Sequence, residues 1–316
     1  MPNKVYILYV LLLFALNSVA QQVNINIQND VVYFSQDDMP ILNYQIAETS
    51  LNGNYKRCNY IHPLYALNGT ILTEDFPEDH PHHRGIFWAW HQILIGNKLV
   101  GDSWELQHIS WDVDTVKEVT TKYSAKAIQA KVFWTSDLWL DANGHEKPFI
   151  QETTTIRVFP KEDNYRKVDI KIELTALVPD VRIGGSENEK GYGGFSTRIK
   201  LPDNVSFISN NKHVAPKNLP IKAGNWMDIS GSLTNYSQAS GLTIFCHPKN
   251  PGKTNRWILR KKRSMQNAVY PYPGSKPVNL SNLKPTVLNY RLIIHDDYAK
   301  SLSLSKLYSD YKKEKI

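Results

Sequence analysis

Apolar and polar side chains alternate with a period of two residues along much of this 316-residue chain. The alternation is clearest in residues 168–176, where every second side chain is apolar, and it recurs in residues 149–159. Successive side chains of a strand point to opposite faces of a sheet, so this pattern is typical of antiparallel strands that bury one face. Only residues 298–315 have the length and composition of a helix. The sequence therefore predicts an all-β fold, a large antiparallel β-sandwich with a short C-terminal helix.

The other predicted strands are short apolar segments that are bounded by turn residues. They are residues 23–27, 31–34, 41–46, 60–65, 99–104, 109–113, 115–123, 125–135, 195–201, 242–245 and 288–294. A glycine-rich polar loop is expected over residues 184–194. No linker, change of composition or fixed-period repeat divides the chain, so residues 21–316 are predicted to form one catalytic domain.

Residues 1–20 have the pattern of a signal peptide. Lys4 precedes an apolar run, residues 5–16, which is too short to span a bilayer, and Ser18-Val19-Ala20 is typical of a cleavage site. We expect the mature chain to begin at Gln21 and to be exported, either to the periplasm or to the medium. No other apolar run approaches the length of a membrane span, so no such span is expected.

Charge and cysteine content limit the class of partner. Lys and Arg number 37 against 30 Asp and Glu, and part of the excess lies in the basic run of residues 260–263. In an exported protein the anionic partner indicated by this charge is an acidic polysaccharide or a membrane surface rather than nucleic acid, although a solvated basic face gives the same count. Cys58 and Cys246 are the two cysteines, and the sequence leaves open a disulfide or two buried thiols.

Titratable side chains are concentrated in residues 75–91. Three histidines and Arg84 fall within residues 80–84, and the aromatic segment that follows carries Trp88 and His91. Histidine titrates near neutral pH and suits proton transfer, while an arginine fork fits a carboxylate. The structural alternative is a polar turn whose histidines cap backbone groups and whose arginine forms an ordinary salt bridge.

A divalent metal is a second interpretation of the same block. In an extended segment His80 and His82 would point to one side and His83 to the other. The first two would then be candidate metal ligands, and the third ligand would come from His91, Asp79 or Glu105. A His-x-His pair is a weak metal signal by itself, so no cofactor is required by the sequence.

Three further segments carry candidate site residues. Tyr192 lies between Gly191 and the pair Gly193-Gly194, where a backbone without side chains can approach a ligand closely, and a glycine-rich turn with a core tyrosine is the structural alternative. His247-Pro248 and His62-Pro63 each follow an apolar run, at the rim of a predicted sheet. A lone histidine in such a place is more often structural than functional.

The candidate residues fall into two groups. The catalytic candidates are His80, His82, His83, Arg84, Tyr192 and His247. The substrate-binding candidates are His62, Trp88, His91, Glu105, Lys190, Arg198 and Arg256.

Four segments resemble a soluble bacterial family that is labelled methane oxygenase PmoA: residues 76–90, 190–195, 247–251 and 290–296. The most specific is the first, Phe-Pro-Glu-Asp-His-Pro-His-His-Arg-Gly-Ile-Phe-Trp-Ala-Trp. A membrane copper oxygenase needs transmembrane helices, which this sequence lacks, so the label does not describe its function. The resemblance implies a galactose-mutarotase-like β-supersandwich and a role in bacterial polysaccharide utilisation. Where the family has Asp before the His247-Pro248 pair, this chain has Cys246.

The chain also resembles the oligosaccharide dehydratase of ulvan breakdown, which removes water from a terminal uronate and leaves a 4,5-unsaturated sugar. This resemblance implies a base for the C5 proton, an acid for the 4-hydroxyl and a cation beside the carboxylate. Histidine and Tyr192 would supply base and acid, Arg84 or Arg198 the cation, and Trp88 or Trp90 a platform for the sugar.

Two other functions stay open at this point. A polysaccharide lyase would share the base and the cation but expel a sugar, and a glycoside hydrolase would need two carboxylates, for which Asp79 and Glu105 are the available pair. A non-catalytic carbohydrate-binding protein would keep the tryptophans without needing the histidines.

Overall fold

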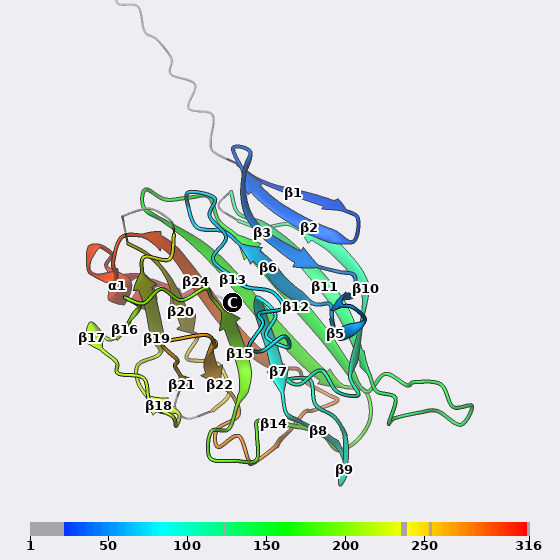
Figure 1. The fold of residues 1–316 in the computed structure, drawn as a ribbon. Helices are drawn as coiled ribbons and strands as arrows, with labels where there is room; N and C mark the ends of the chain where they lie inside the picture. The colour runs from blue at the N-terminus through cyan, green and yellow to red at the C-terminus, as the bar shows by residue number, and fades with distance from the viewer. Residues whose placement is uncertain (1–21, 123, 235–238, 253–254, 315–316) are drawn as a thin grey trace, which may run out of the picture.

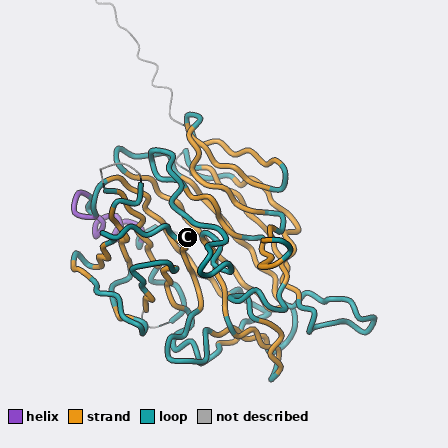
Figure 2. The backbone as a smooth tube through the Cα atoms, in the orientation of Figure 1, coloured by secondary structure: helices purple, strands orange, loops and turns teal. Residues whose placement is uncertain are grey.

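The computed structural model describes residues 22–122, 124–234, 239–252 and 255–314. Two wide sheets lie one in front of the other (Figure 1), and strands and loops make up nearly all of the described chain (Figure 2). This architecture confirms the predicted all-β, antiparallel sandwich. The predicted signal peptide lies outside the described residues. Within them, no helix is both long enough and apolar enough to cross a membrane.

Sheet 1 carries the His-rich block and has nine antiparallel strands. In spatial order they are β1 (Val23–Gln28), β2 (Val31–Gln36), β3 (Met39–Gln45), β6 (Tyr60–Leu64), β7 (Ile86–Trp90), β15 (Gly193–Arg198), β22 (Met265–Val269), β21 (Arg256–Ile258) and β18 (Ile221–Lys222).

Sheet 2 also has nine antiparallel strands. In spatial order they are β10 (Ser110–Val119), β11 (Lys126–Thr135), β12 (Ile150–Val158), β13 (Tyr165–Ala176), β24 (Thr286–Asp296), β20 (Ser240–Cys246), β19 (Trp226–Gly231), β16 (Ser206–Ser209) and β17 (Lys212–His213). The strongest alternation in the sequence falls on β12 and β13, whose residues are alternately buried and half-buried.

The remaining elements are small. A four-stranded sheet contains β23 (Val278–Asn279), β14 (Val181–Gly184), β8 (Gln92–Ile95) and β9 (Lys98–Gly101), and a hairpin contains β4 (Thr49–Leu51) and β5 (Asn54–Arg57). The C-terminal segment forms a 3-10 turn, η1 (Ala299–Ser301), and one helix, α1 (Leu304–Tyr311), so the helix is shorter than the residues 298–315 predicted from composition.

The central strands of sheet 1 are buried on both faces. Trp88 and Trp90 of β7 point into the main core between the sheets, whereas Phe87 and Ala89 belong to a second apolar cluster on the outer face. Trp104 covers that outer face, so β7 shows none of the alternation that marks a strand with one solvated side. This covered outer face forms the floor of the candidate site.

Both cysteines are buried and free. Cys58 lies just after β5, and Cys246 ends β20 in sheet 2. The structure therefore favours two buried thiols over a disulfide. Burial raises the pKa of the Cys58 thiol to about 12, which keeps it protonated and unreactive.

Candidate active site

A tight turn before β7 gathers the three histidines into one cluster. The backbone N–H of His80 donates to Pro77, and that of His83 donates to His80. The His80 and His83 rings stack with centroids 4.7 Å apart, and the His82 ring meets His83 edge-on at 4.5 Å. The expectation that His83 would point away from His80 was wrong, because the segment is a turn rather than an extended strand.

The three imidazole rings of the cluster differ in their exposure to solvent. Burial is the largest cause that lowers the pKa of His82, to about 4, and neighbouring histidines lower it further. His83 is 2% exposed, and the same causes lower its pKa to about 2. Both rings are therefore neutral at working pH and resist protonation, whereas the His80 ring is more exposed and lies 2.7 Å from the Asp79 carboxylate.

Acidification is expected to destabilise the protein through these buried histidines. Below pH 6.5 these two histidines become protonated in the unfolded chain but stay neutral in the folded protein. For each unit by which the pH falls, each histidine therefore lowers the free energy of unfolding by about 1.4 kcal/mol. The loss from His82 ends near its folded pKa of about 4. Urea titrations between pH 7 and 4.5 measure the slope.

His83→Phe should remove the contribution of His83 and make the free energy of unfolding depend less on pH. The phenyl ring is also an aromatic ring, but it has no group that titrates. The matched control is His108→Phe, since His108 is half-exposed and paired with Asp137 far from the turn in sequence. An unchanged slope in His83→Phe would show that the buried ring does not resist protonation.

His91 is oriented by a carboxylate partner beside the cluster. Its Nδ1 lies 2.8 Å from Asp102 Oδ2, and its ring stacks on Trp104 with centroids 5.4 Å apart. Asp102 is fixed in turn, because its Oδ1 accepts hydrogen bonds from the backbone N–H groups of Trp104 and Glu105, both at 2.8 Å. This pairing leaves the Nε2 atom of His91 available to accept a proton.

Tyr192 completes the cluster from the glycine-rich loop. Its ring packs against Trp104 at 5.5 Å and lies 6.5 Å from the His91 ring. The guanidinium Nη2 of Arg260 donates to the Tyr192 hydroxyl oxygen at 2.7 Å, so the hydroxyl proton is left to point elsewhere. The predicted loop thus brings a proton donor beside an oriented imidazole.

A surface cavity of about 540 Å³ opens beside this cluster. It is lined by His91, Gln92, Leu94, Leu99, Asp102, Ser186, Glu187 and Asn188. Ligand sites are usually concave, with a few convergent polar groups, and this cavity has that character. Glu105 is half-exposed and lies 3.6 Å from His82 Nδ1, and burial is the largest cause that raises its pKa.

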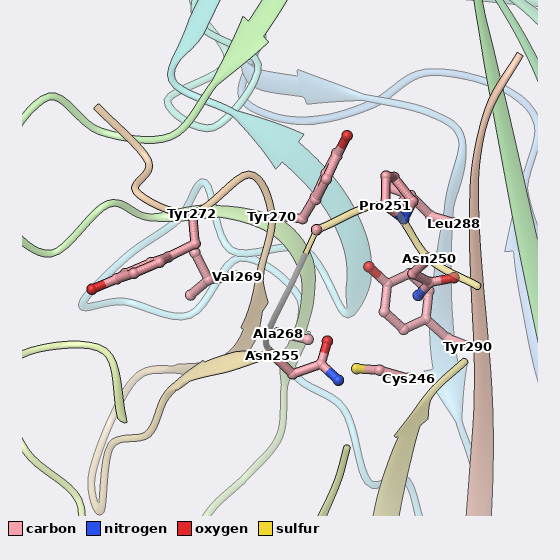
Figure 3. Close-up of a pocket in the computed structure, with 11 residues that line it drawn as sticks. Cys246, Asn250, Pro251, Asn255, Ala268, Val269, Tyr270, Tyr272, Leu288 and Tyr290 are labelled. Atoms are coloured by element: carbon pink, nitrogen blue, oxygen red, sulfur yellow. The ribbon is translucent and has the colours of Figure 1, made fainter. Parts of the chain in front are cut away.

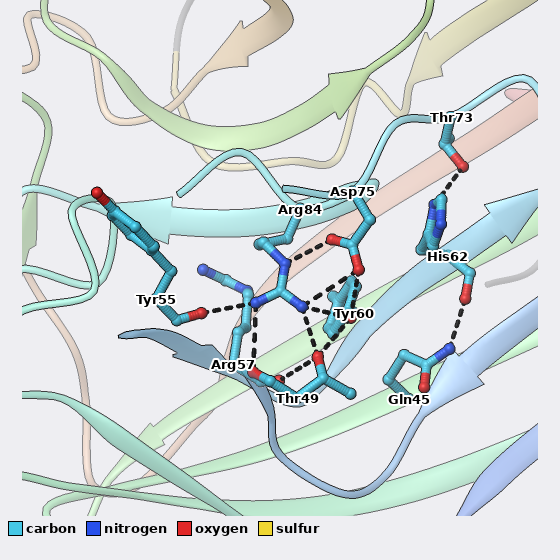
Figure 4. A network of polar contacts seen from close by, with 9 residues as sticks. All are labelled: Gln45, Thr49, Tyr55, Arg57, Tyr60, His62, Thr73, Asp75 and Arg84. Carbon is cyan, nitrogen blue, oxygen red and sulfur yellow. Dashed lines mark hydrogen bonds and ion pairs between the residues drawn. The ribbon is translucent and has the colours of Figure 1, made fainter. Parts of the chain in front are cut away.

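Arg84 does not face this cavity. Its side chain is fully buried, its Nε donates to Asp75 at 2.5 Å, and its Nη2 donates to the Tyr60 hydroxyl at 2.7 Å (Figure 4). The other guanidinium donors go to Thr49 and to the backbone oxygen of Tyr55. With all its donors occupied, Arg84 ties the β4–β5 hairpin to the His-rich turn and cannot clamp a substrate carboxylate in this geometry.

Arg198 and Trp88 are also occupied inside the protein. Arg198 donates bidentately to Asp79 and through Nε to Glu74, so its cation is matched by two carboxylates. Trp88 is 1% exposed and donates to the buried Glu152 at 3.0 Å. Trp88 and the fully buried Trp90 therefore cannot stack on a sugar in this geometry.

Of the remaining candidates, Lys190 lies beside Tyr192, whereas His62, His247 and Arg256 make their contacts elsewhere. His62 pairs with Thr73 at 2.9 Å, and burial is the largest cause that lowers its pKa. His247 is buried in contact with Tyr311 of α1, on the side of sheet 2. Arg256 lies over the Tyr272 ring at 4.8 Å, and Lys190 is exposed with its Nζ 5.9 Å from the Tyr192 ring.

The structure adds Asp102, Trp104, Arg260 and Arg57 to the site, none of which was predicted to be a site residue. Arg57 is 1% exposed, donates to the backbone oxygens of Trp88 and Ser103, and has no carboxylate in ion-pair contact. Burial is the largest cause that lowers its pKa, to about 9, so it remains a cation beneath the cluster. A signal for Asp102 was present in the sequence, since it is an acidic residue shortly after His91.

A metal centre receives no support from the described part of the chain. Within it, no group of three or more His, Cys, Asp or Glu side chains is arranged to hold a metal ion. His80 and His82 face each other at 5.7 Å between ring centroids, edge to face. We therefore derive no chemistry through a metal.

Comparisons with known proteins identify a family and a distant structural likeness. Residues 32–309 match the model of DUF6807, a family of unknown function. No curated protein matches the chain. Among solved structures the chain is similar to a "putative mutarotase (YeaD)" from Salmonella typhimurium, with 10% identity and a TM-score of 0.35 over 87% of this chain and 94% of that chain. None of these matches names a substrate for this chain.

Proposed function

This chain belongs to DUF6807, a family of unknown function, and we propose that it is an enzyme that removes water from the terminal uronate of acidic oligosaccharides. The observation that carries the proposal is the His91–Asp102 pair beside Tyr192 and two neutral imidazoles. General acid–base catalysis needs an oriented base and a nearby acid, and this cluster offers both.

The reaction is a β-elimination. The Nε2 atom of His91 takes the proton from C5, and the electron pair of that bond forms the C4=C5 double bond. The C4–O bond breaks, and the Tyr192 hydroxyl gives its proton to the departing oxygen, which leaves as water. Asp102 stabilises the imidazolium that forms on His91, as in other Asp–His pairs. His91 then releases its extra proton to solvent, and Tyr192 takes a proton from solvent, which returns both groups to their starting state.

The substrate carboxylate needs a cation as negative charge develops at C5. Arg84 and Arg198 are matched by internal carboxylates, so we assign this role to the cations near Tyr192 and His91. Lys190 and Arg260 flank the Tyr192 ring, and buried Arg57 adds a positive charge below. The basic run of residues 260–263 begins at Arg260 and favours an acidic glycan at this rim.

The choice of a uronate rests on the chemistry and on a resemblance. A proton on the carbon beside a carboxylate is acidic enough for an imidazole base to remove with electrostatic help. The resemblance of the chain to the oligosaccharide dehydratase of ulvan breakdown favours the same substrate class. We place the activity outside the cytoplasm because residues 1–20 resemble a signal peptide.

The test is a product assay with uronate-terminated ulvan oligosaccharides. We expect an ultraviolet absorbance from the conjugated unsaturated uronate, together with a product mass that is lower by one water and an unchanged chain length. Shortened chains with the same absorbance would indicate a polysaccharide lyase, and shortened chains without it a glycoside hydrolase. Binding without any new product would indicate a carbohydrate-binding protein, and each of these results would overturn the proposal.

A further inference from the structure

A second cavity, of about 300 Å³, opens between the two sheets. Its walls come from β20 and β24 of sheet 2, from β22 of sheet 1 and from the segments after β20 and β22 (Figure 3). The described residues that line it are Cys246, Asn250, Pro251, Gly252, Asn255, Ala268, Val269, Tyr270, Tyr272, Leu288 and Tyr290. None of them belongs to the acid–base cluster, so the cavity is a separate feature.

Several polar groups that line this cavity form no hydrogen bond with the described residues. Tyr290 is 2% exposed, its ring stacks on Phe195 at 4.2 Å, and its hydroxyl has no hydrogen bond to any described residue. The Cys246 thiol, also 2% exposed, has none either. The Asn255 amide nitrogen donates to Asn225, which leaves its oxygen unbonded among the described residues. These groups line the cavity and are free to bond to a ligand or to ordered water.

Hydrogen bonds within the protein fix part of the cavity wall. The side-chain amide of Asn250 donates to the backbone oxygen of Asn289 and accepts from its backbone N–H. The backbone oxygen of Tyr270 accepts a hydrogen bond from Trp90 Nε1 at 2.8 Å, which anchors the segment after β22 to the core. The Tyr290 ring is fixed by its stack on Phe195, so a ligand that bonds to its hydroxyl loses little side-chain entropy.

We propose that this cavity is a binding site for a neutral pyranose unit. The described lining residues carry no formal charge, so an ion would lose its water without gaining a counter-charge. The Tyr270 ring offers an apolar face, while the Tyr290 hydroxyl and the Asn255 oxygen offer hydrogen bonds, and a sugar ring has both apolar C–H faces and hydroxyl groups. The site does not depend on the proposed dehydration, because it shares no residue with that chemistry.

Titration calorimetry with D-glucose as the neutral probe tests this proposal. We expect the wild-type protein to bind glucose and Tyr290→Phe to weaken the affinity about tenfold, because one hydrogen bond is lost with little change in volume. Asn255→Ala, at the half-buried rim, should weaken it several-fold. Tyr33→Phe, an exposed tyrosine on β2, is the matched control and should bind as the wild type does. D-glucuronate has the same ring with a carboxylate. Tyr290→Phe should not weaken any binding of D-glucuronate.

Three results would overturn the proposal: no glucose binding by the wild type, glucose binding that neither Tyr290→Phe nor Asn255→Ala weakens, or glucuronate binding that depends on Tyr290 as strongly as glucose binding does. A wild-type protein that binds glucose but does not dehydrate uronates would count only against the acid–base site. Loss of glucose binding in Asn255→Ala with normal dehydration would support two separate sites.

Discussion

His91→Ala is expected to lower kcat for uronate dehydration by about 10²–10⁴-fold, the usual contribution of a general base. The variant removes the imidazole that Asp102 orients at 2.8 Å, and solvent water is a weaker and unpositioned base. KM should change much less, because the contact is gained mainly in the transition state. Initial rates followed by the absorbance of the unsaturated product give both constants, and a thermal melt checks that the variant is folded.

His108→Ala supplies a control with matching geometry. His108 Nδ1 lies 2.8 Å from Asp137, the same separation as in the His91–Asp102 pair, but both side chains are at least half exposed. This variant should keep wild-type turnover. Equal activity in His91→Ala and the wild type would remove His91 as the base, and an equal loss in both variants would point to a general effect of removing a His–Asp pair.

The fold could be predicted from the sequence wherever one strand face is buried and the other is not. β12 and β13 follow this rule, and their predicted ranges agree with the structure within a few residues. Residues 109–113 and 115–123 were predicted as two strands but form one, β10, because a bulge between Val113 and Thr115 shifts the alternation. Very short strands, such as β17 and β18 with two residues each, carry no periodic signal at all.

The sequence indicated part of the candidate site but not the contacts that its residues make. The density of histidines in residues 80–83 identified the block, and the glycine-rich loop identified Tyr192. Hydrogen-bond partners depend on the fold, since Arg260 meets Tyr192 across 68 residues of sequence. The structural role of Arg84 was not predicted for the same reason, because it depends on the β4–β5 hairpin, which the sequence pattern did not reveal.

Arg84→Met should destabilise the protein by about 3–5 kcal/mol, the usual cost of breaking a buried ion pair. The variant removes a guanidinium that is fully buried and leaves the Asp75 carboxylate, only 15% exposed, without its cation. It also removes the donor to the backbone oxygen of Tyr55 and one of the donors to the Tyr60 hydroxyl. Urea unfolding at pH 7 measures the change in free energy.

Arg157→Met is the control for this loss, because Arg157 forms a longer ion pair, 3.9 Å from Asp169, and its side chain is 40% exposed. Its free energy of unfolding should change by no more than about 0.5 kcal/mol. The two roles considered for Arg84 then separate cleanly. A stabilising role predicts a large loss of stability with KM unchanged in the folded fraction, since the side chain contacts no ligand. A substrate clamp predicts the reverse, a raised KM at normal stability, and that result would mean that the Asp75–Arg84 pair opens when substrate binds.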